Sequence, residues 1–301
     1  MNNSRKVFYK ILIATSSACA ITTCLLMPTS CGATVPLKMT SEQINQFANA
    51  LKNPLPQTAA YQPMINWMNG SNAENKHKLL LLGYDGTRVD AAARLSEDSA
   101  IFSNAYNGHP YFAHCGGAKR GNQKTSSNPG WCSVFTGVWG RENGIKNNDS
   151  DGVLKKPIIQ STLANRGIET YFGNCEFGWV WNSIMENSTV DYHGKSSDAD
   201  ILIDAKQRIS EDYPAVFCIF DDVDHNGHRT GFDPDNSQYM DALKETDAKA
   251  KELISTVESR DNEDWMIVMT TDHGGNGKRG HGGNSDGEFY TWFSCNKNIF
   301  A

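Results

Sequence analysis

The sequence lacks several features that would assign it to a common class of protein. None of its eight cysteines forms a Cys-x-x-Cys pair, so a cysteine-based zinc knuckle is not expected. Lys and Arg number 28 against 34 Asp and Glu, which gives a net charge of −6. Because nucleic acids are bound through their phosphates by cationic surfaces, nucleic acid is not expected as a general partner. The chain also contains no internal repeat and no low-complexity tract, which argues against a repeat architecture.

The first 33 residues have the pattern of a secretory leader. Three cations, Arg5, Lys6 and Lys10, precede the apolar stretch Ile11–Met27, and small residues follow it. The stretch is shorter than the roughly 20 apolar residues that a membrane-spanning helix needs. We therefore predict that residues 1–33 direct export to the periplasm or the extracellular space and are removed.

Membrane attachment is the alternative that this N-terminus leaves open. Cys31 follows Thr29 and Ser30 as in a bacterial lipobox, although Pro28 stands where Leu is usual. An uncleaved N-terminal anchor is the other form of attachment, and the short apolar stretch favours cleavage over it.

Export also changes what the remaining cysteines are expected to do. Beyond the leader, the chain has Cys115, Cys132, Cys175, Cys218 and Cys295. In an oxidising compartment one or two disulfides are expected among them, with an odd thiol left over. Cys218 lies within an apolar run and is expected to be a small buried hydrophobic residue.

The chain is long enough to bury one full-sized core, at 301 residues and 33.2 kDa. We predict a leader at 1–33, an N-terminal extension at 34–77 and one catalytic domain at 78–301. Within the extension, Thr40 and Gln43 form a capping-box pattern at the start of a helix over Ser41–Leu51.

Strand-like and helical patterns alternate after residue 77. Lys78–Gly83 contains four consecutive leucines, as in a strand buried on both faces. Two more strand-like runs, Ala215–Phe220 and Trp265–Thr270, enclose the regular helical pattern of Gln238–Arg260. Further helices are expected at Arg88–Glu97, Lys156–Asn165 and Ala199–Ser210, and short strands at Ile168–Phe172 and Phe289–Phe293. Alternating strands and helices predict an α/β fold with a mainly parallel central sheet and helices on both faces.

Asp and His residues gather directly after the strand-like runs. Asp224 and His228 follow the run that ends at residue 220, and Asp272 and His273 follow the run that ends at residue 270, with His281 a few residues on. Carboxylate oxygen and imidazole nitrogen from separate segments are the ligands that Zn²⁺ collects. In an open α/β sheet, active sites lie at the carboxyl ends of the strands. The pattern therefore predicts a metal site there.

Two further residues extend this pattern. Asp85 follows the leucine run, where a lone Asp is often a turn or cap residue, but its placement matches that of Asp224 and Asp272. Pro129 suits the first turn of a helix, which puts Ser127 at a helix N-terminus with backbone N–H groups free to bind an anion. Capping of that helix by Ser126 or Ser127 is the plainer interpretation of the same motif.

Five motifs, taken in order, resemble the alkaline phosphatase superfamily. They are Gly83-Tyr84-Asp85-Gly86, Ser127-x-Pro129 with Thr136-Gly137, Asp224-x-x-Gly227-His228, Asp272-His273-Gly274 and Gly280-His281-Gly282. The likeness is strongest to the type I phosphodiesterase/nucleotide pyrophosphatase branch and covers roughly Lys78 to Phe293. Five motifs in the family's order are far more specific than any one of them.

The resemblance implies two Zn²⁺, or other divalent ions, held side by side. One ion would be bound by Asp224, His228 and His281, and the other by Asp85, Asp272 and His273. The Ser127 hydroxyl would adjoin the second ion as a further ligand and as the nucleophile, since in this family the nucleophile lies ten residues before the Gly of the Thr-Gly pair. His225 matches no ligand position.

The implied activity is hydrolysis of a small phosphate ester, a diester or a monoester, through a phosphoseryl intermediate. A sulfatase of the same fold is one alternative, but Trp131 stands where sulfatases normally have the Arg that accompanies formylglycine. A non-catalytic, anion-binding surface lipoprotein is the other. Gly130 stands where the phosphodiesterase branch commonly has Asn, so nucleotide specificity is not implied. The sequence leaves the oligomeric state open.

Overall fold

The computed structural model describes residues 36–48, 53–72, 76–149, 152–175, 181, 185 and 188–300. The predicted leader at 1–33, including Cys31, lies outside these residues, so export and lipid attachment stay predictions. Within the described ranges, no helix is long and apolar enough to cross a membrane.

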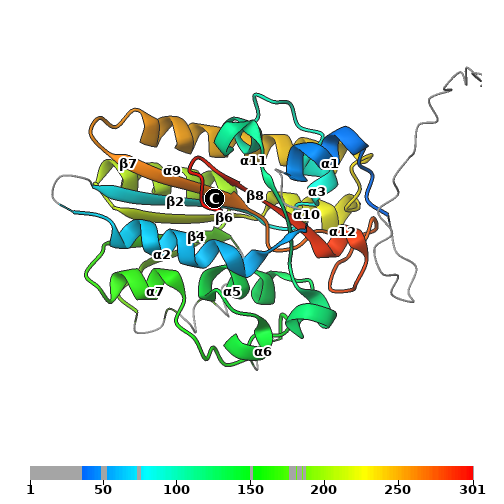
Figure 1. The fold of residues 1–301 in the computed structure, drawn as a ribbon, viewed down its shortest axis with the longest axis horizontal. Coiled ribbons are helices and arrows are strands. Elements are labelled where there is room, and N and C mark those ends of the chain that lie inside the picture. The colour runs from blue at the N-terminus through cyan, green and yellow to red at the C-terminus, as the bar shows by residue number, and fades with distance from the viewer. Residues whose placement is uncertain are drawn as a thin grey trace, which may run out of the picture. The chain divides into compact units, whose positions relative to one another are not determined.

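A mainly parallel eight-stranded sheet lies at the centre of the fold, in the order β1-β3-β8-β7-β2-β6-β4-β5 (Figure 1). The strands are β1 (Leu55–Pro56), β2 (His77–Tyr84), β3 (Tyr111–His114), β4 (Thr170–Cys175), β5 (Asp191–Lys195), β6 (Ala215–Phe220), β7 (Asp264–Thr270) and β8 (Tyr290–Cys295). Strand β8 runs antiparallel to β3 and β7, and the other neighbouring strands pair in parallel.

Helices cover both faces of this sheet (Figure 1). One face packs against α1 (Ser41–Ala48), α3 (Val89–Ala92), α4 (Ala100–Ser103), α9 (Asp198–Ser210) and α11 (Ser237–Glu258). The other packs against α2 (Tyr61–Asn69), α5 (Ser127–Thr136) and α7 (Ile159–Ala164). The remaining described elements are η1 (Gln57–Ala60), η2 (Tyr106–Gly108), η3 (Gly117–Gly121), α6 (Gly140–Asn143), α10 (Asp222–Thr230) and α12 (Asp286–Phe289). The predicted α/β fold class is confirmed.

The leucine run of β2 contributes side chains to the hydrophobic cores on both faces of the sheet. Leu80 and Leu82 belong to the hydrophobic core on the α11 side, whereas Leu79 and Leu81 belong to the core on the α5 side. Because side chains alternate along a strand, a strand buried on both faces needs apolar residues at every position. The four leucines therefore place β2 in the interior of the sheet, between β6 and β7.

Most expected elements occur near their expected positions. The capping box of α1 forms as predicted, since the backbone N–H groups of Thr40 and Gln43 donate to each other's side chains. The boundary between an extension at 34–77 and a catalytic domain at 78–301 stays a prediction, although β1 joins the sheet by pairing with β3.

Three expected boundaries were wrong. The helix expected at Arg88–Glu97 is only α3 (Val89–Ala92), and the one at Lys156–Asn165 begins later, as α7 (Ile159–Ala164). Strand β4 continues through Gly173 instead of ending there. A Cβ at Gly173 would lie 2.3 Å from the Tyr171 hydroxyl, so this glycine makes room for a ring on the same face of the strand.

The cysteines beyond the leader are unpaired. All five are buried thiols, and none of them forms a disulfide in the structure. Burial raises the pKa of Cys295 to about 12 and that of Cys218 further still. These cysteines therefore behave as small hydrophobic core residues, as expected for Cys218, and the disulfides expected from export do not form.

A buried ion pair at the amino end of β2 makes stability depend on pH. Glu263 accepts hydrogen bonds from Arg260, Lys78 and Trp265. Burial acts to raise the pKa of Glu263, but these three donors lower it to about 2 from its ordinary 4.5. Because the folded-state pKa is the lower one, the ionised carboxylate stabilises the fold above about pH 4.5, and this is lost as the pH falls through about 2.

We expect Glu263→Gln to lower the free energy of unfolding at neutral pH by about 1–3 kcal/mol, since a charged acceptor of three partly buried hydrogen bonds is lost. Urea unfolding should show the difference from the wild type shrinking as the pH falls from about 4.5 to 2. Asp241→Asn is the control, because it removes an exposed pair with Lys244 and should change stability by less than about 1 kcal/mol at any pH. A difference that stays constant with pH would contradict the assignment.

Candidate active site

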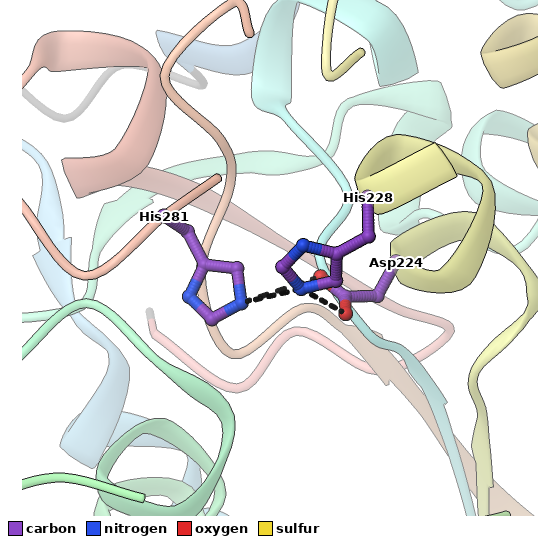
Figure 2. Close-up of side chains that lie close together, drawn as sticks. All are labelled: Asp224, His228 and His281. Atoms are coloured by element: carbon purple, nitrogen blue, oxygen red, sulfur yellow. Dashed lines mark hydrogen bonds and ion pairs between the residues drawn. The ribbon is translucent and has the colours of Figure 1, made fainter. Parts of the chain in front are cut away.

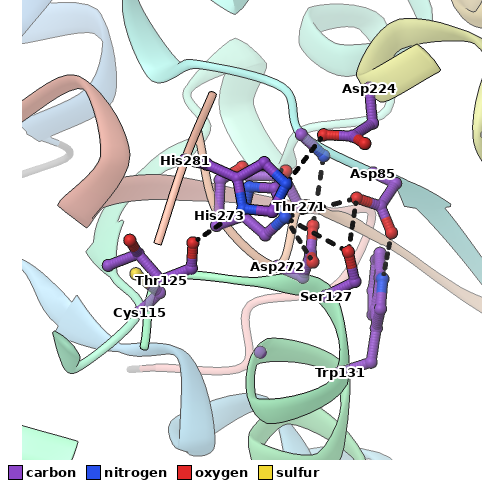
Figure 3. A network of polar contacts seen from close by, with 12 residues as sticks. Asp85, Cys115, Thr125, Ser127, Trp131, Asp224, Thr271, Asp272, His273 and His281 are labelled. Carbon is purple, nitrogen blue, oxygen red and sulfur yellow. Dashed lines mark hydrogen bonds and ion pairs between the residues drawn. The ribbon is translucent and has the colours of Figure 1, made fainter. Parts of the chain in front are cut away.

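The predicted site residues meet at the carboxyl ends of three adjacent strands. Asp85 follows β2, Asp224 lies in α10 directly after β6, and Asp272 follows β7. Strand β2 pairs in parallel with both β6 and β7, so these three ends lie at one edge of the sheet. Tertiary structure thus brings together residues that are as far apart in sequence as 85 and 281 (Figure 3).

Asp224, His228 and His281 form one group of potential metal ligands (Figure 2). Residues Asp224 and His228 are four apart in α10, which places them on one face of the helix. The His228 Nε2 atom lies 3.2 Å from Asp224 Oδ2 and 3.0 Å from His281 Nε2. His225, on another face of α10, is exposed and belongs to neither group.

A second group adjoins the first and shares Asp224 with it. One ligand atom from each of Asp85, Asp224 and His273 lies within 4.8 Å of the others. His273 Nε2 is 3.5 Å from Asp85 Oδ1 and 3.3 Å from Asp272 Oδ2. Asp85, Asp272 and His273, which the family resemblance groups together, thus lie near one another, but the group whose ligand atoms meet contains Asp224 in place of Asp272.

Ser127 contacts the second group directly. It is the first residue of α5 and is 2 % exposed. Its Oγ lies 3.4 Å from Asp85 Oδ1, to which it donates, and 3.3 Å from His273 Nε2. The N-cap of the helix is Ser126, whose side chain makes no capping hydrogen bond. The plainer interpretation, in which one of these hydroxyls caps α5, is therefore wrong.

The expectation of free N–H groups at this helix end needs correction as well. The backbone N–H of Asn128 donates to the side-chain oxygen of Asn148 at 3.0 Å. Pro129 has no N–H, and that of Gly130 bonds the carbonyl oxygen of Ser126. Three of the first four positions of α5 thus offer no free N–H to an anion. One of these N–H groups is bound by Asn148, a loop residue that the sequence did not suggest.

The imidazole rings are held by backbone carbonyls outside the ligand groups. The Nδ1 atoms of His228, His273 and His281 lie 3.1, 2.7 and 3.2 Å from the carbonyl oxygens of Arg279, Gly274 and Thr125, respectively. A carbonyl oxygen accepts hydrogen bonds only, so Nδ1 carries the proton in each ring. Each Nε2 therefore directs a lone pair into the site whenever the ring is neutral, as a metal ligand must.

The polar atoms of the site fit a divalent cation. Oδ1 of Asp224 and Oδ2 of Asp272 are buried and have no hydrogen-bond partner. No ion pair within the described residues joins Asp85, Asp224 or Asp272 to a lysine or an arginine. Buried carboxylates need a hydrogen bond, an ion pair or a metal, and carboxylate and imidazole ligands suit Zn²⁺.

The pKa values of the site residues also reflect the crowding of carboxylates and imidazoles. Burial, together with repulsion from neighbouring carboxylates, raises the pKa of Asp85 and of Asp272 well above the ordinary value. Burial lowers the pKa of His273 and His281 to about 3, whereas a hydrogen bond to Asp224 raises that of His228 to about 9. A bound cation would favour the ionised carboxylates and a neutral His228.

A family model matches the part of the chain that contains Asp224 and Asp272. Residues 180–278 match the family model described as type I phosphodiesterase / nucleotide pyrophosphatase. The resemblance inferred from the sequence motifs is confirmed. The match includes the motifs around Asp224 and Asp272, whereas Asp85, Ser127 and His281 lie outside it. No curated protein sequence matches the chain.

Solved structures with a similar fold include several phosphorus-handling enzymes. The periplasmic domain of the phosphoethanolamine transferase EptC from Campylobacter jejuni has a TM-score of 0.50 at 15 % identity, over 74 % of this chain and 80 % of that chain. Murine ectonucleotide pyrophosphatase/phosphodiesterase 5 has a TM-score of 0.48 at 18 % identity, over 66 % of this chain. The alignment spans 57 % of the murine chain. At such identities the likeness to EptC concerns the fold alone.

Close packing of α5 on the end of β7 explains the glycine at position 130. A Cβ on Gly130 would lie 2.6 Å from the carbonyl oxygen of Asp272 and 2.7 Å from its Cβ. The family's usual Asn therefore has no room at this position.

We expect Gly130→Ala to destabilise the protein by about 1–3 kcal/mol, because the helix and Asp272 must move apart. We also expect it to weaken binding of divalent ions. Thermal unfolding with and without Zn²⁺ measures both effects. In the control Gly194→Ala, the nearest atom to the new Cβ is 3.5 Å away, and neither quantity should fall. Wild-type stabilisation of the Gly130→Ala variant by Zn²⁺ would contradict the prediction.

Proposed function

We propose that this protein is an exported, metal-dependent phosphoester hydrolase in which Ser127 is the nucleophile. The observation that carries the proposal is the position of the Ser127 hydroxyl, within 3.4 Å of Asp85 and 3.3 Å of His273 at the edge of a buried group of carboxylates and imidazoles. The family match supports phosphoester chemistry, and the buried oxygens without partners support the metal requirement.

Two divalent ions, most simply Zn²⁺, account for the ligands. One is assigned to Asp224, His228 and His281, and the other to Asp85, Asp272 and His273, with Ser127 next to the second. When bound, such ions supply positive charge that lowers the pKa of a nearby hydroxyl and stabilises negative charge on phosphoryl oxygens.

The protein's own groups orient the nucleophile. Ser127 begins α5, whose position is fixed by the contact of Gly130 with Asp272. Its hydroxyl donates to Asp85 Oδ1, so the lone pairs of Oγ are directed away from that carboxylate. Attack of Oγ on phosphorus forms a Ser127 O–P bond and breaks the P–O bond to the substrate's alcohol, which leaves with the proton that Ser127 loses. Water then hydrolyses the ester and frees Ser127.

We infer from side-chain exposure that a substrate reaches the site from the side of His228. The side chain of His228 is 45 % exposed, while Asp224 and His273 are buried. A small phosphate ester therefore approaches past His228 toward Ser127. Both phosphodiesters and phosphomonoesters fit this description, and a side-by-side assay chooses between them.

Removal of metal should abolish activity. We expect the purified protein to bind about two Zn²⁺ and to cleave a nitrophenyl phosphodiester or phosphomonoester. A chelator should stop turnover, and added Zn²⁺ should restore it. His228→Ala should lose one ion. His225→Ala is the control and should keep two, because His225 lies in the same helix, three residues before His228, but belongs to neither group. Turnover by metal-free protein, or turnover of sulfate monoesters alone, would refute the proposal.

Ser127→Ala tests the nucleophile separately from the metal. We expect turnover to fall by about 10³-fold or more, since a covalent nucleophile is lost, while metal content stays at the wild-type level. Ser126→Ala is the matched control, because the adjacent hydroxyl is buried and has no hydrogen-bond partner. Rapid quenching of the wild type should trap a phosphoryl group on the peptide that contains Ser127. Retained activity in Ser127→Ala would rule out this assignment.

A further inference from the structure

Helix α5 contacts both oxygens of a single carboxylate. The Ser127 hydroxyl lies 3.4 Å from Asp85 Oδ1, and the indole Nε1 of Trp131 donates to Asp85 Oδ2 at 2.8 Å (Figure 3). Ser127 and Trp131 are four residues apart, about one helical turn, so they lie on the same face of α5. Asp85 is therefore held by two side chains of one helix.

Strand β2 is shaped to accept the indole ring. The Trp131 side chain is almost fully buried and stacks on Phe135, with ring centroids 5.7 Å apart. A Cβ on Gly83 would lie 2.4 Å from Cη2 of this ring. The glycine two residues before Asp85 thus provides the space that the indole fills, and any larger residue would displace the ring from its hydrogen bond.

The bond to Asp85 is more than a consequence of burying a tryptophan. A buried indole N–H usually finds a partner, yet this fold also buries Trp292 completely, and Nε1 of Trp292 has no hydrogen-bond partner. Burial alone therefore does not account for the 2.8 Å contact of Trp131 with a carboxylate oxygen at the proposed metal centre.

We propose that Trp131 is a positioning residue for the metal centre. Its N–H occupies Oδ2 of Asp85 and leaves Oδ1 as the oxygen that binds the ion. Oδ1 is also the atom that lies 3.5 Å from His273 Nε2 and accepts from Ser127. Without the indole N–H the carboxylate is free to turn about its Cβ–Cγ bond. The inference rests on the proposed function, since it requires Asp85 to bind a metal ion.

Trp131→Phe, which keeps an aromatic ring and removes the N–H, is compared with Trp292→Phe as the matched control. Competition with a chromophoric chelator measures Zn²⁺ affinity, and the visible absorption of Co²⁺-loaded protein reports ligand geometry. We expect Trp131→Phe to bind one of the two ions about 10–100-fold more weakly, as when a metal ligand loses its supporting hydrogen bond. Its Co²⁺ spectrum should change, while Trp292→Phe matches the wild type in both measurements.

Each outcome separates this inference from the proposed function. If the wild-type protein binds no divalent ion, the proposed function fails, and the inference fails with it. If the wild type binds two ions and Trp131→Phe binds them with the same affinity and spectrum, the inference alone is overturned.

A second measurement covers the case in which Trp131→Phe does not fold. Metal-free protein carrying ¹⁵N-labelled tryptophan should show one indole N–H resonance that moves in Asp85→Ala, because its hydrogen-bond acceptor is gone. If none of the indole resonances moves, the hydrogen bond does not exist in solution and the inference is overturned.

Discussion

The fold brings three carboxylates together in a place that water barely reaches. Asp85, Asp224 and Asp272 are each no more than 2 % exposed. Burial and repulsion between carboxylates raise the pKa of Asp85 and of Asp272, and a bound cation would offset this repulsion. The same place receives imidazole nitrogens whose other ring nitrogens are bound to backbone carbonyls. Carboxylate oxygens and imidazole Nε2 atoms therefore face one another, and two of the oxygens have no hydrogen-bond donor, as is expected where a cation binds.

The central strands of the sheet hold these three carboxylates close together. Strand β2 lies between β6 and β7 in parallel register, so the three strand ends that carry the aspartates coincide. Apolar side chains on both faces of β2 fix the strand within two hydrophobic cores. Helix α5 then packs on Asp272 through Gly130 and on β2 through Trp131. The carboxylates are therefore positioned by packing, which allows them to stay close despite their mutual repulsion.

The apolar pattern of the sequence and the order of its motifs predicted the central strands and the Asp residues that follow them. The leucine run predicted β2, and the strand ends predicted where Asp85 and Asp272 would meet. Helix α10 was not predicted, because its sequence has only Val223 as a large apolar residue and so no apolar stripe for periodicity to detect. Trp131 was noticed only as a departure from the sulfatase pattern, and Asn148 gave no signal at all. Their partners lie 46 and 20 residues away, respectively.

The α/β fold class, the strands that end at the site and the residue types that gather there could all be inferred from the amino-acid sequence. These follow from local apolar pattern and from the position of each Asp and His after a strand. The folded chain was needed to show that Oδ1 of Asp85 is the oxygen next to Ser127 and His273, and that Asp224 is shared by the two groups. The physical reason is that hydrogen bonds act over about 3 Å, so these choices depend on neighbours that only folding brings within reach.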